Sequence, residues 1–179
     1  MLIPSVVALV LMSADIGEIM RANQDALQMY THKRRTEITY KDNTRTRVDE
    51  VRYVDGVMKV TPVSGGGGQG DGGQRRKAGP LARKRVEKKV REMREDAQEL
   101  VAALQQYLQP SEKSQLTWDE AAQLPSPISI RKDLKGGPAT IQVTFARLPD
   151  GGPFYASTAT VEQPKKKLTI RVENFDYVK

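Results

Sequence analysis

Two stretches of the chain alternate apolar and polar residues, and turn-forming residues divide each stretch into short runs. Residues 37–63 hold three runs, separated by the polar segment 41–43 and by Asp55-Gly56, which is a strong hairpin signal. Residues 127–178 hold four more, separated by turns rich in glycine, aspartate, proline and lysine. Alternation places the apolar side chains on one face of a strand. The pattern therefore predicts about seven antiparallel strands, each with one polar, solvated face.

The last run changes phase near its end. Its apolar residues alternate regularly over 168–172, whereas Phe175 and Tyr177 fall out of phase with that set. An extra residue in one strand has this effect, so we expect a β-bulge near 173–174. The predicted strands span residues 37–41, 47–54, 57–63, 127–134, 139–148, 153–162 and 167–178.

Between the two stretches the apolar residues follow a helical period instead. Pro80 suits the first turn of a helix, and Pro110 cannot continue one. We therefore predict a long helix over 80–108, with one apolar stripe that must pack on another element. The stripe consists of Val86, Val90, Met93, Ala97, Leu100, Val101, Leu104 and Leu108.

Two shorter helices are also expected, over 15–30 and 117–124. Asp15 and Thr117 are each followed three residues later by glutamate, which is the spacing of a capping box. The first of these segments also repeats apolar residues at helical spacing. Both patterns indicate a helix that begins at the capping residue.

These elements together predict an α+β domain over residues 15–179. Its fold class is an antiparallel, curved, half-barrel-like sheet of about seven strands, with the long helix and an N-terminal helix on the concave face. Residues 64–79 are rich in glycine and predict a flexible linker. A G-x-G-x-x-G pattern within them lacks the buried strand before it and the helix directly after it that a dinucleotide site needs, so we interpret it as linker.

The chain opens with an apolar segment, residues 2–14. It is too short to span a bilayer, which needs about 20 residues. Its length, and the small Ala14 at its end, favour a signal peptide over residues 1–14, although no basic residue precedes it. The alternative is an additional buried strand or helical extension. We expect a periplasmic or secreted protein.

The net charge of +7 is concentrated in one segment, because residues 65–110 hold ten basic and six acidic side chains. On a helix, Lys84, Lys88 and Arg91 fall opposite the apolar stripe, so they are interpreted mainly as its solvated face. The basic residues nevertheless occupy the helix's N-terminal half, which opposes the macrodipole. An anionic membrane surface would explain this order. The expected contacts are Arg75, Arg76, Lys77, Arg83, Lys84 and Lys88.

No arrangement of residues in the sequence calls for catalysis, a metal or a cofactor. The chain has no cysteine and one histidine, His32, which we interpret as an exposed residue at the start of a strand. The adjacent carboxylates Asp49 and Glu50 point to opposite faces of a strand. Asp119 and Glu120 are explained by capping of the short helix. We therefore expect a protein that is not an enzyme.

The segments ARKRVEKKVREMREDAQELVAALQQYLQP and ASTATVEQPKKKLTIRVENFDYVK resemble a group of uncharacterised bacterial secreted proteins. Those are similar in turn to the outer-membrane lipoprotein carrier fold, of the LolA/LolB type. That resemblance implies an open half-barrel with helices over an apolar concave face. It also implies an extracytoplasmic protein that holds something apolar.

We therefore expect a monomeric, non-catalytic binding protein for a lipid, an acyl chain or a lipoprotein segment. One alternative is a structural or protein-interaction module with a filled core. A second is a basic nucleic-acid-binding protein, against which stands the lack of a recognition motif and of an aromatic residue in the basic segment. The residues expected to line the ligand are Ile38, Tyr40, Val51, Tyr53, Ile141, Val143 and Phe145.

Overall fold

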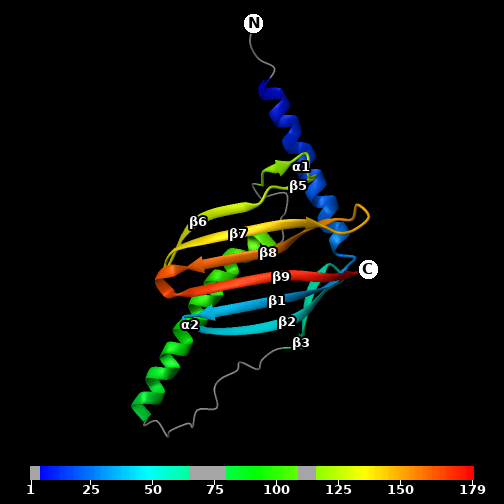
Figure 1. Cartoon of the computed structure of the whole chain (residues 1–179). Coiled ribbons are helices and arrows are strands. Elements are labelled where there is room, and N and C mark those ends of the chain that lie inside the picture. Colours follow the sequence, from blue (N-terminus) through cyan, green and yellow to red (C-terminus); the bar gives the residue numbers. More distant parts are fainter. Residues whose placement is uncertain (1–4, 65–79, 109–115) are drawn as a thin grey trace.

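The computed structural model describes residues 5–64, 80–108 and 116–179. It contains two long helices and an open antiparallel sheet of seven strands, so the predicted α+β class is confirmed (Figure 1). The helices are α1 (Ser5–Leu27) and α2 (Pro80–Leu108). The sheet strands are β1 (Thr31–Tyr40), β2 (Asn43–Val54), β3 (Val57–Ser64), β6 (Ile128–Leu134), β7 (Gly137–Arg147), β8 (Phe154–Gln163) and β9 (Leu168–Val178).

The sheet joins two meanders that are far apart in the sequence. The strand order is β3-β2-β1-β9-β8-β7-β6, so the first strand of the chain lies beside the last. In that pairing Ile38 lies opposite Ile170 and Tyr40 lies opposite Leu168. The predicted turn at 55–56 is confirmed, and that at 41–43 is confirmed over 41–42, since Asn43 begins β2. Lys41 and Asp55 have positive φ angles of 56° and 53°.

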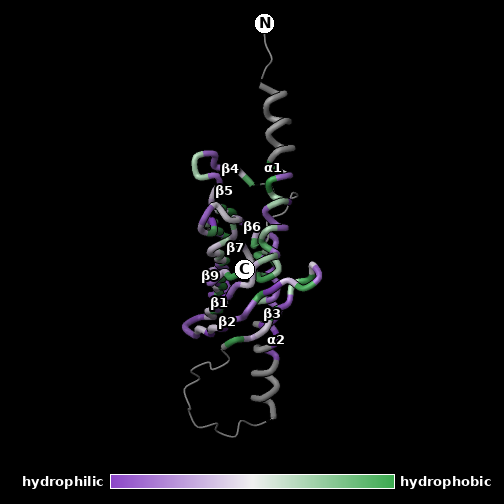
Figure 2. Tube along the Cα trace, turned by 90° about the vertical axis from the view of Figure 1, so that its right-hand side faces the viewer, coloured by the Kyte–Doolittle hydropathy of each residue, from purple (hydrophilic) through white to green (hydrophobic). Residues whose placement is uncertain are grey.

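Both helices lie on the same side of the sheet (Figure 2). We call that side the concave face. The described part of α2 packs on β7, β8 and β9, and α1 contacts the beginning of β8. Among the described residues no helix is long and apolar enough to cross a membrane.

The core lies between α2 and the centre of the sheet. Leu100 and Leu104 of α2 are each 1% exposed, and the strand residues beneath them are equally buried. Burial of one such side chain contributes about 1.5–3 kcal/mol to folding, so this contact is the main stabilising feature of the fold. Its fully enclosed members are Leu100, Ala103, Leu104, Ala139, Ile141, Val143, Ala156, Ala159, Val161, Leu168, Ile170 and Val172.

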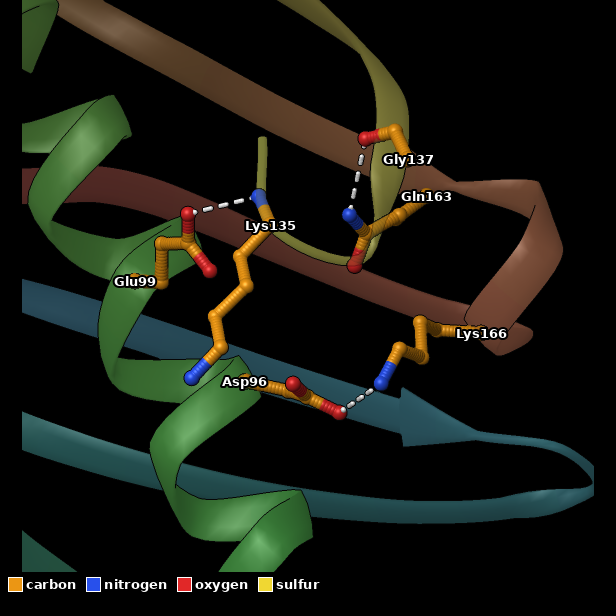
Figure 3. Close-up of polar contacts among 6 residues, drawn as sticks. All are labelled: Asp96, Glu99, Lys135, Gly137, Gln163 and Lys166. Carbon is orange, nitrogen blue, oxygen red and sulfur yellow. Dashed lines mark hydrogen bonds and ion pairs between the residues drawn. The ribbon is translucent and has the colours of Figure 1, made fainter. Parts of the chain in front are cut away.

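Polar contacts hold the middle of α2 at the end of the sheet where β6 turns into β7 (Figure 3). The backbone N–H of Lys135 donates to Glu99 Oε1 over 2.9 Å, and Lys166 Nζ lies 2.9 Å from Asp96 Oδ2. Gln163 Nε2 donates to the carbonyl of Gly137 over 3.0 Å. Asp96 and Glu99 of α2 therefore bind the turns that connect the strands of the sheet.

The opposite face of the sheet is polar, as the alternation predicts. Lys33 Nζ lies 3.0 Å from Asp176 Oδ2, and Arg35 Nη1 lies 2.8 Å from Glu173 Oε2. The Arg35 guanidinium also lies 5.1 Å from the centre of the Phe175 ring. Cross-strand pairs of this kind stabilise an exposed sheet face modestly, by about 0.2–1 kcal/mol each.

Two of the predicted helices have different bounds or do not form. Helix α1 begins at Ser5 rather than at Asp15, so the apolar segment is part of the helix and Asp15 is not its N-cap. The predicted helix over 117–124 is wrong. That segment forms a small hairpin of β4 (Trp118–Asp119) and β5 (Leu124–Pro125).

The turn of this hairpin explains why the sequence was misinterpreted. Asp119 Oδ1 accepts hydrogen bonds from the backbone N–H groups of Ala121 and Ala122, both over 3.0 Å. A side-chain oxygen that caps N–H groups two and three residues ahead serves a turn as well as a helix. The capping residue is therefore Asp119, and it caps a turn.

The bulge predicted near 173–174 lies further along β9. Asn174 is buried like Leu168, Ile170 and Val172, so the alternation of β9 is unbroken up to this residue. The pairing of β1 with β9 shifts between Thr31 and Lys33. At this point Asp176 has a φ of 52°. The shift therefore involves His32 and the end of β9, and it brings Tyr177 next to His32.

Candidate functional site

The concave side of β1 changes character along the strand. Ile38 and Tyr40 pack against the core under α2, whereas His32 and Arg34, which share their face, lie beyond it. All four residues differ by even numbers, so a strand presents them on one side. The concave face is thus apolar beneath α2 and polar at the end nearest the C-terminus of α1.

At this polar end the side chains leave a cavity of about 40 Å³, partly open to solvent, which we call the His32 pocket. Both helices, three central strands and β2 contribute to its wall. The lining residues are Asn23, Gln24, Leu27, His32, Arg34, Tyr53, Leu108, Tyr155, Ala156, Asn174 and Tyr177.

His32 is 7% exposed, so its predicted position as an exposed strand residue is wrong. Its ring stacks on Tyr177, with 4.5 Å between ring centres and 12° between planes. Neither ring nitrogen has a hydrogen-bond partner among the described residues. Burial, and secondly the nearby charge of Arg34, lower the pKa of His32 from 6.5 to about 4, so the imidazole is neutral at pH 7.

Arg34 brings a positive charge to the pocket. Its Nε donates to Asn174 Oδ1 over 3.1 Å, and Asn174 in turn donates from Nδ2 to the carbonyl of Ala156 over 2.8 Å. Burial lowers the pKa of Arg34, although an arginine remains protonated at neutral pH. The guanidinium is therefore oriented by an amide and not by a carboxylate.

The carboxylate nearest in register to Arg34 is engaged elsewhere. Asp49 lies opposite Arg34 in the pairing of β1 with β2 and is 6% exposed. Its Oδ1 accepts a hydrogen bond from Arg47 Nε over 2.5 Å. In the described part of the chain Arg34 forms no ion pair within 4.0 Å. Asp49 compensates the charge of Arg34 only at longer range, without a direct contact.

Tyrosines form one wall of the pocket. Tyr177 lies 4.3 Å from Tyr155 between ring centres, and 6.5 Å from Tyr30 in an edge-to-face arrangement. Burial, and secondly Tyr155, raise the pKa of Tyr177, so its hydroxyl keeps its proton at any physiological pH. This wall supplies flat aromatic surface and hydroxyl groups without adding charge.

Helix α1 is positioned over the pocket by Asn23. Its Nδ2 donates to the carbonyl of Phe154 over 2.8 Å, and its Oδ1 accepts from the Phe154 N–H over 2.7 Å. The side-chain amide thus pairs with the first residue of β8 as a neighbouring strand would. This contact brings Gln24 and Leu27 to the rim of the pocket.

The lining therefore combines one positive charge, a neutral imidazole, amides and phenols. None of the described lining residues is a carboxylate, serine or cysteine. No group of three or more histidine, aspartate or glutamate residues that could hold a metal occurs in the described part of the chain. Such a lining is suited to binding a small polar group.

Of the residues predicted to line a ligand, only Tyr53 lines the His32 pocket. Val51, Ile141 and Val143 are 0–1% exposed. Ile38, Tyr40 and Phe145 are half-buried against the core beneath α2. Tyr40 also lines an open surface cavity that it shares with acidic residues of α2, such as Asp96 and Glu99. The other five pack in or against the core, and the contact of all seven with a ligand stays a prediction.

The predicted anionic-surface residues are mostly outside the described part of the structure. Arg75, Arg76 and Lys77 fall in the segment 65–79, and the side chains of Arg83 and Lys84 are likewise not described. Lys88 is exposed, and its Nζ lies 3.9 Å from Glu92 Oε1, as its i,i+4 spacing predicts. Binding to an anionic surface remains a prediction.

Sequence reasoning missed the His32 pocket although one signal was present. His32 and Arg34 have the same parity as Ile38 and Tyr40, so extending the strand predicted at 37–41 back to His32 would have placed them on the concave face. The missing information was that β9 and α1 close over that end of β1. Pairing across more than 130 residues leaves no local trace in the sequence.

Comparison of the chain with protein-family models, with curated proteins and with solved structures finds no significant match in any of the three. The resemblance to the lipoprotein carrier fold therefore stays a prediction. What the protein does has to be argued from the geometry of the His32 pocket.

Proposed function

We propose that this chain is a non-catalytic binding protein whose ligand occupies the His32 pocket at the open end of the concave face. One observation carries the proposal. His32 is 7% exposed and lines a cavity, yet neither of its ring nitrogens has a hydrogen-bond partner among the described residues. Buried polar atoms in folded proteins are nearly always paired, and the exceptions call for an explanation.

The energetic cost of this arrangement supports a functional reason for it. A buried polar group without a protein partner costs about 1–3 kcal/mol. A phenylalanine at position 32 would stack on Tyr177 without that cost. The presence of an unpartnered imidazole at the wall of a cavity therefore supports a ligand that accepts or donates a hydrogen bond there.

The packing of the core limits where an apolar part of the proposed ligand could lie. Around Leu100 and Leu104 of α2 the concave face is filled, since these two residues are 1% exposed and the buried strand residues below them are at most 5% exposed. An acyl chain could occupy that region only by displacing them. We therefore place any apolar portion along Leu27 and Leu108, which belong to the pocket wall. An extracytoplasmic location, argued from the apolar segment 2–14, belongs to the same proposal.

The second candidate is a protein-interaction module without a small ligand. The filled core beneath α2 favours it, because a carrier of long acyl chains needs space that this region does not offer. A protein-interaction module of this kind would give the unpartnered His32 no role. For that reason we prefer the binding protein.

The chain offers a direct test, because His32 is its one histidine. The imidazole resonances of protein labelled with ¹⁵N-histidine report on this pocket alone. We expect at least one compound from a panel of small acids, amides, alcohols and amines to shift them and to raise the melting temperature. His32→Phe, which keeps the aromatic stack, should abolish the rise in melting temperature. If no compound moves the resonances, the proposal is wrong.

A further inference from the structure

We infer that the ligand group bound in the His32 pocket is a carboxylate, held by the guanidinium of Arg34. This inference rests on the proposed function above and names the chemical class of its ligand. It follows from the charge, the hydrogen-bonding groups and the size of the pocket, which are taken in turn.

The charge of the pocket favours an anion. Arg34 is the only lining residue that carries a formal charge at neutral pH among those the structure describes. Asp49, the carboxylate opposite Arg34 in register, is bound to Arg47. A partly desolvated cation is costly unless an opposite charge compensates it, and Asp49 acts on Arg34 only at longer range. A bound anion would add direct compensation, whereas a cationic ligand would be repelled by Arg34.

The donors are arranged for a planar anion. Arg34 uses Nε for Asn174, which fixes the plane of the guanidinium, and its two Nη groups have no partner among the described residues. Two parallel N–H groups match the two oxygens of a carboxylate. The neutral His32 ring carries one N–H that can donate to the same group. The Asn174 amide, held by Ala156, keeps this arrangement in place before a ligand arrives.

The size of the pocket limits the buried part of the ligand. A cavity of about 40 Å³ accommodates about three water-sized spheres, since each needs roughly 10–15 Å³. That space suits a carboxylate with the carbon next to it. A longer ligand would extend past Leu27 and Leu108 to the rim. The carboxylate can thus belong to a short free acid or to the head of an amphiphile, and chain length distinguishes these two sources.

The test is a titration of the wild-type protein, followed through the His32 imidazole resonances and by calorimetry. The probes are acetate, hexanoate and dodecanoate, with acetamide, hexanamide and hexylamine as matched compounds that lack the negative charge. We expect acetate or hexanoate, where it binds, to do so at least tenfold more tightly than its matched amide. An optimum at acetate identifies a short free acid, and affinity that rises with chain length identifies an amphiphile.

Two variants separate the charge of Arg34 from charge elsewhere on the same strand. Arg34→Gln should weaken carboxylate binding at least tenfold. Arg35→Gln alters the neighbouring arginine, which points to the opposite face and pairs with Glu173, and it should leave the affinity within about twofold. Equal losses in both variants would overturn the inference, because a diffuse surface charge would then account for binding.

The outcomes also distinguish this inference from the proposed function. If amides or amines shift the His32 resonances as strongly as the carboxylates do, the His32 pocket binds a ligand but the carboxylate assignment is wrong. Should none of the six probes move those resonances, the carboxylate inference is likewise overturned. In that case the panel of acids, amides, alcohols and amines described above still tests whether the His32 pocket binds any ligand. These arms use the wild-type chain, so they hold even if Arg34→Gln fails to fold.

Discussion

The two ends of the concave face are built on the same strands but serve different purposes. Beneath α2 the buried cluster consists of apolar side chains, and Ile141, Val161 and Ile170 are completely buried. At the other end the same face carries His32 and Arg34, with a cavity between them and α1. The first arrangement maximises apolar burial. The second gives up part of that stability to keep polar groups in the interior.

This contrast indicates where function and stability are divided in the molecule. In a packed apolar face, a buried charge or an empty cavity lowers the stability of the fold. In a polar pocket, unpaired hydrogen-bonding groups lower stability too, but a ligand can bind to them. The helices mark the boundary, since α2 covers the apolar end and the last turns of α1 close the polar end. Four predictions test the division, from the largest expected effect to the smallest.

The largest effect is expected from Leu100→Asp. This change places a charge at a position that is 1% exposed in the centre of the core, so we expect a loss of roughly 4 kcal/mol or more and an unfolded or molten chain. Lys88→Asp on the exposed side of the same helix is the matched control and should change the free energy of unfolding by less than about 1 kcal/mol. Urea unfolding followed by circular dichroism measures both. Equal effects would contradict the docking of α2 through its apolar stripe.

The next effect is a dependence of stability on pH that originates in the polar end. Because the pKa of His32 is about 4 in the folded protein and 6.5 is its ordinary value, the unfolded chain binds the proton more tightly. His32 therefore leaves the fold undisturbed above pH 6.5, destabilises it progressively as the pH falls from 6.5 to 4, and adds no further loss below pH 4. The total is about 3 kcal/mol.

His32→Phe isolates this contribution. The variant should lose much of the pH dependence between pH 6.5 and 4, while retaining that of the acidic residues elsewhere. Urea unfolding of both proteins at pH 7 and pH 4.5 provides the comparison. A wild-type slope identical to that of the variant would mean that His32 is solvated in the folded state, and the polar end would then not be an interior site.

A smaller effect is expected where α1 is attached. Asn23→Ala removes both hydrogen bonds to the backbone of Phe154, so we expect a loss of about 1–3 kcal/mol. Since Asn23 also lines the His32 pocket, ligand affinity should fall together with stability. Asn23→Asp keeps one acceptor and should recover part of the stability. Unchanged stability in the alanine variant would show that α1 does not close the polar end.

The smallest effect concerns the solvated face, which belongs to neither end. A double-mutant cycle of Arg35→Ala and Glu173→Ala should give a coupling energy of about 0.2–1 kcal/mol, because both side chains are substantially exposed. The coupling should shrink in 1 M salt. A coupling of several kcal/mol would mean that this face is covered in the folded protein.

Much of the secondary structure could be predicted from the sequence, because its signals are local. The period of two and the turn at Asp55-Gly56 lead directly to β2 and β3, and the bounding Pro80 marks the start of α2. The helix prediction at 117–124 was wrong, and the cause is also local. Asp119 caps backbone N–H groups in a turn as well as it would in a helix.

The candidate site could not be predicted in the same way. The strand predicted at 37–41 in fact begins at Thr31, which puts His32 and Arg34 on the concave face, but their burial depends on what covers that face. The cover comes from Tyr177 at the other end of the chain and from Gln24 of α1. A histidine flanked by polar residues therefore gave no sign that it would be enclosed.

The sequence by itself determined the class of the fold, the location of most elements and the side of each strand that meets the core, because side-chain periodicity is a property of neighbouring residues. Only the tertiary structure decided that β1 pairs with β9, and that a pocket forms around His32 and Arg34. The physical reason is that a desolvated polar group depends on its surroundings. Around His32 and Arg34 these surroundings include residues more than 100 positions away in the sequence. They come into contact only when β1 pairs with β9 in the folded sheet.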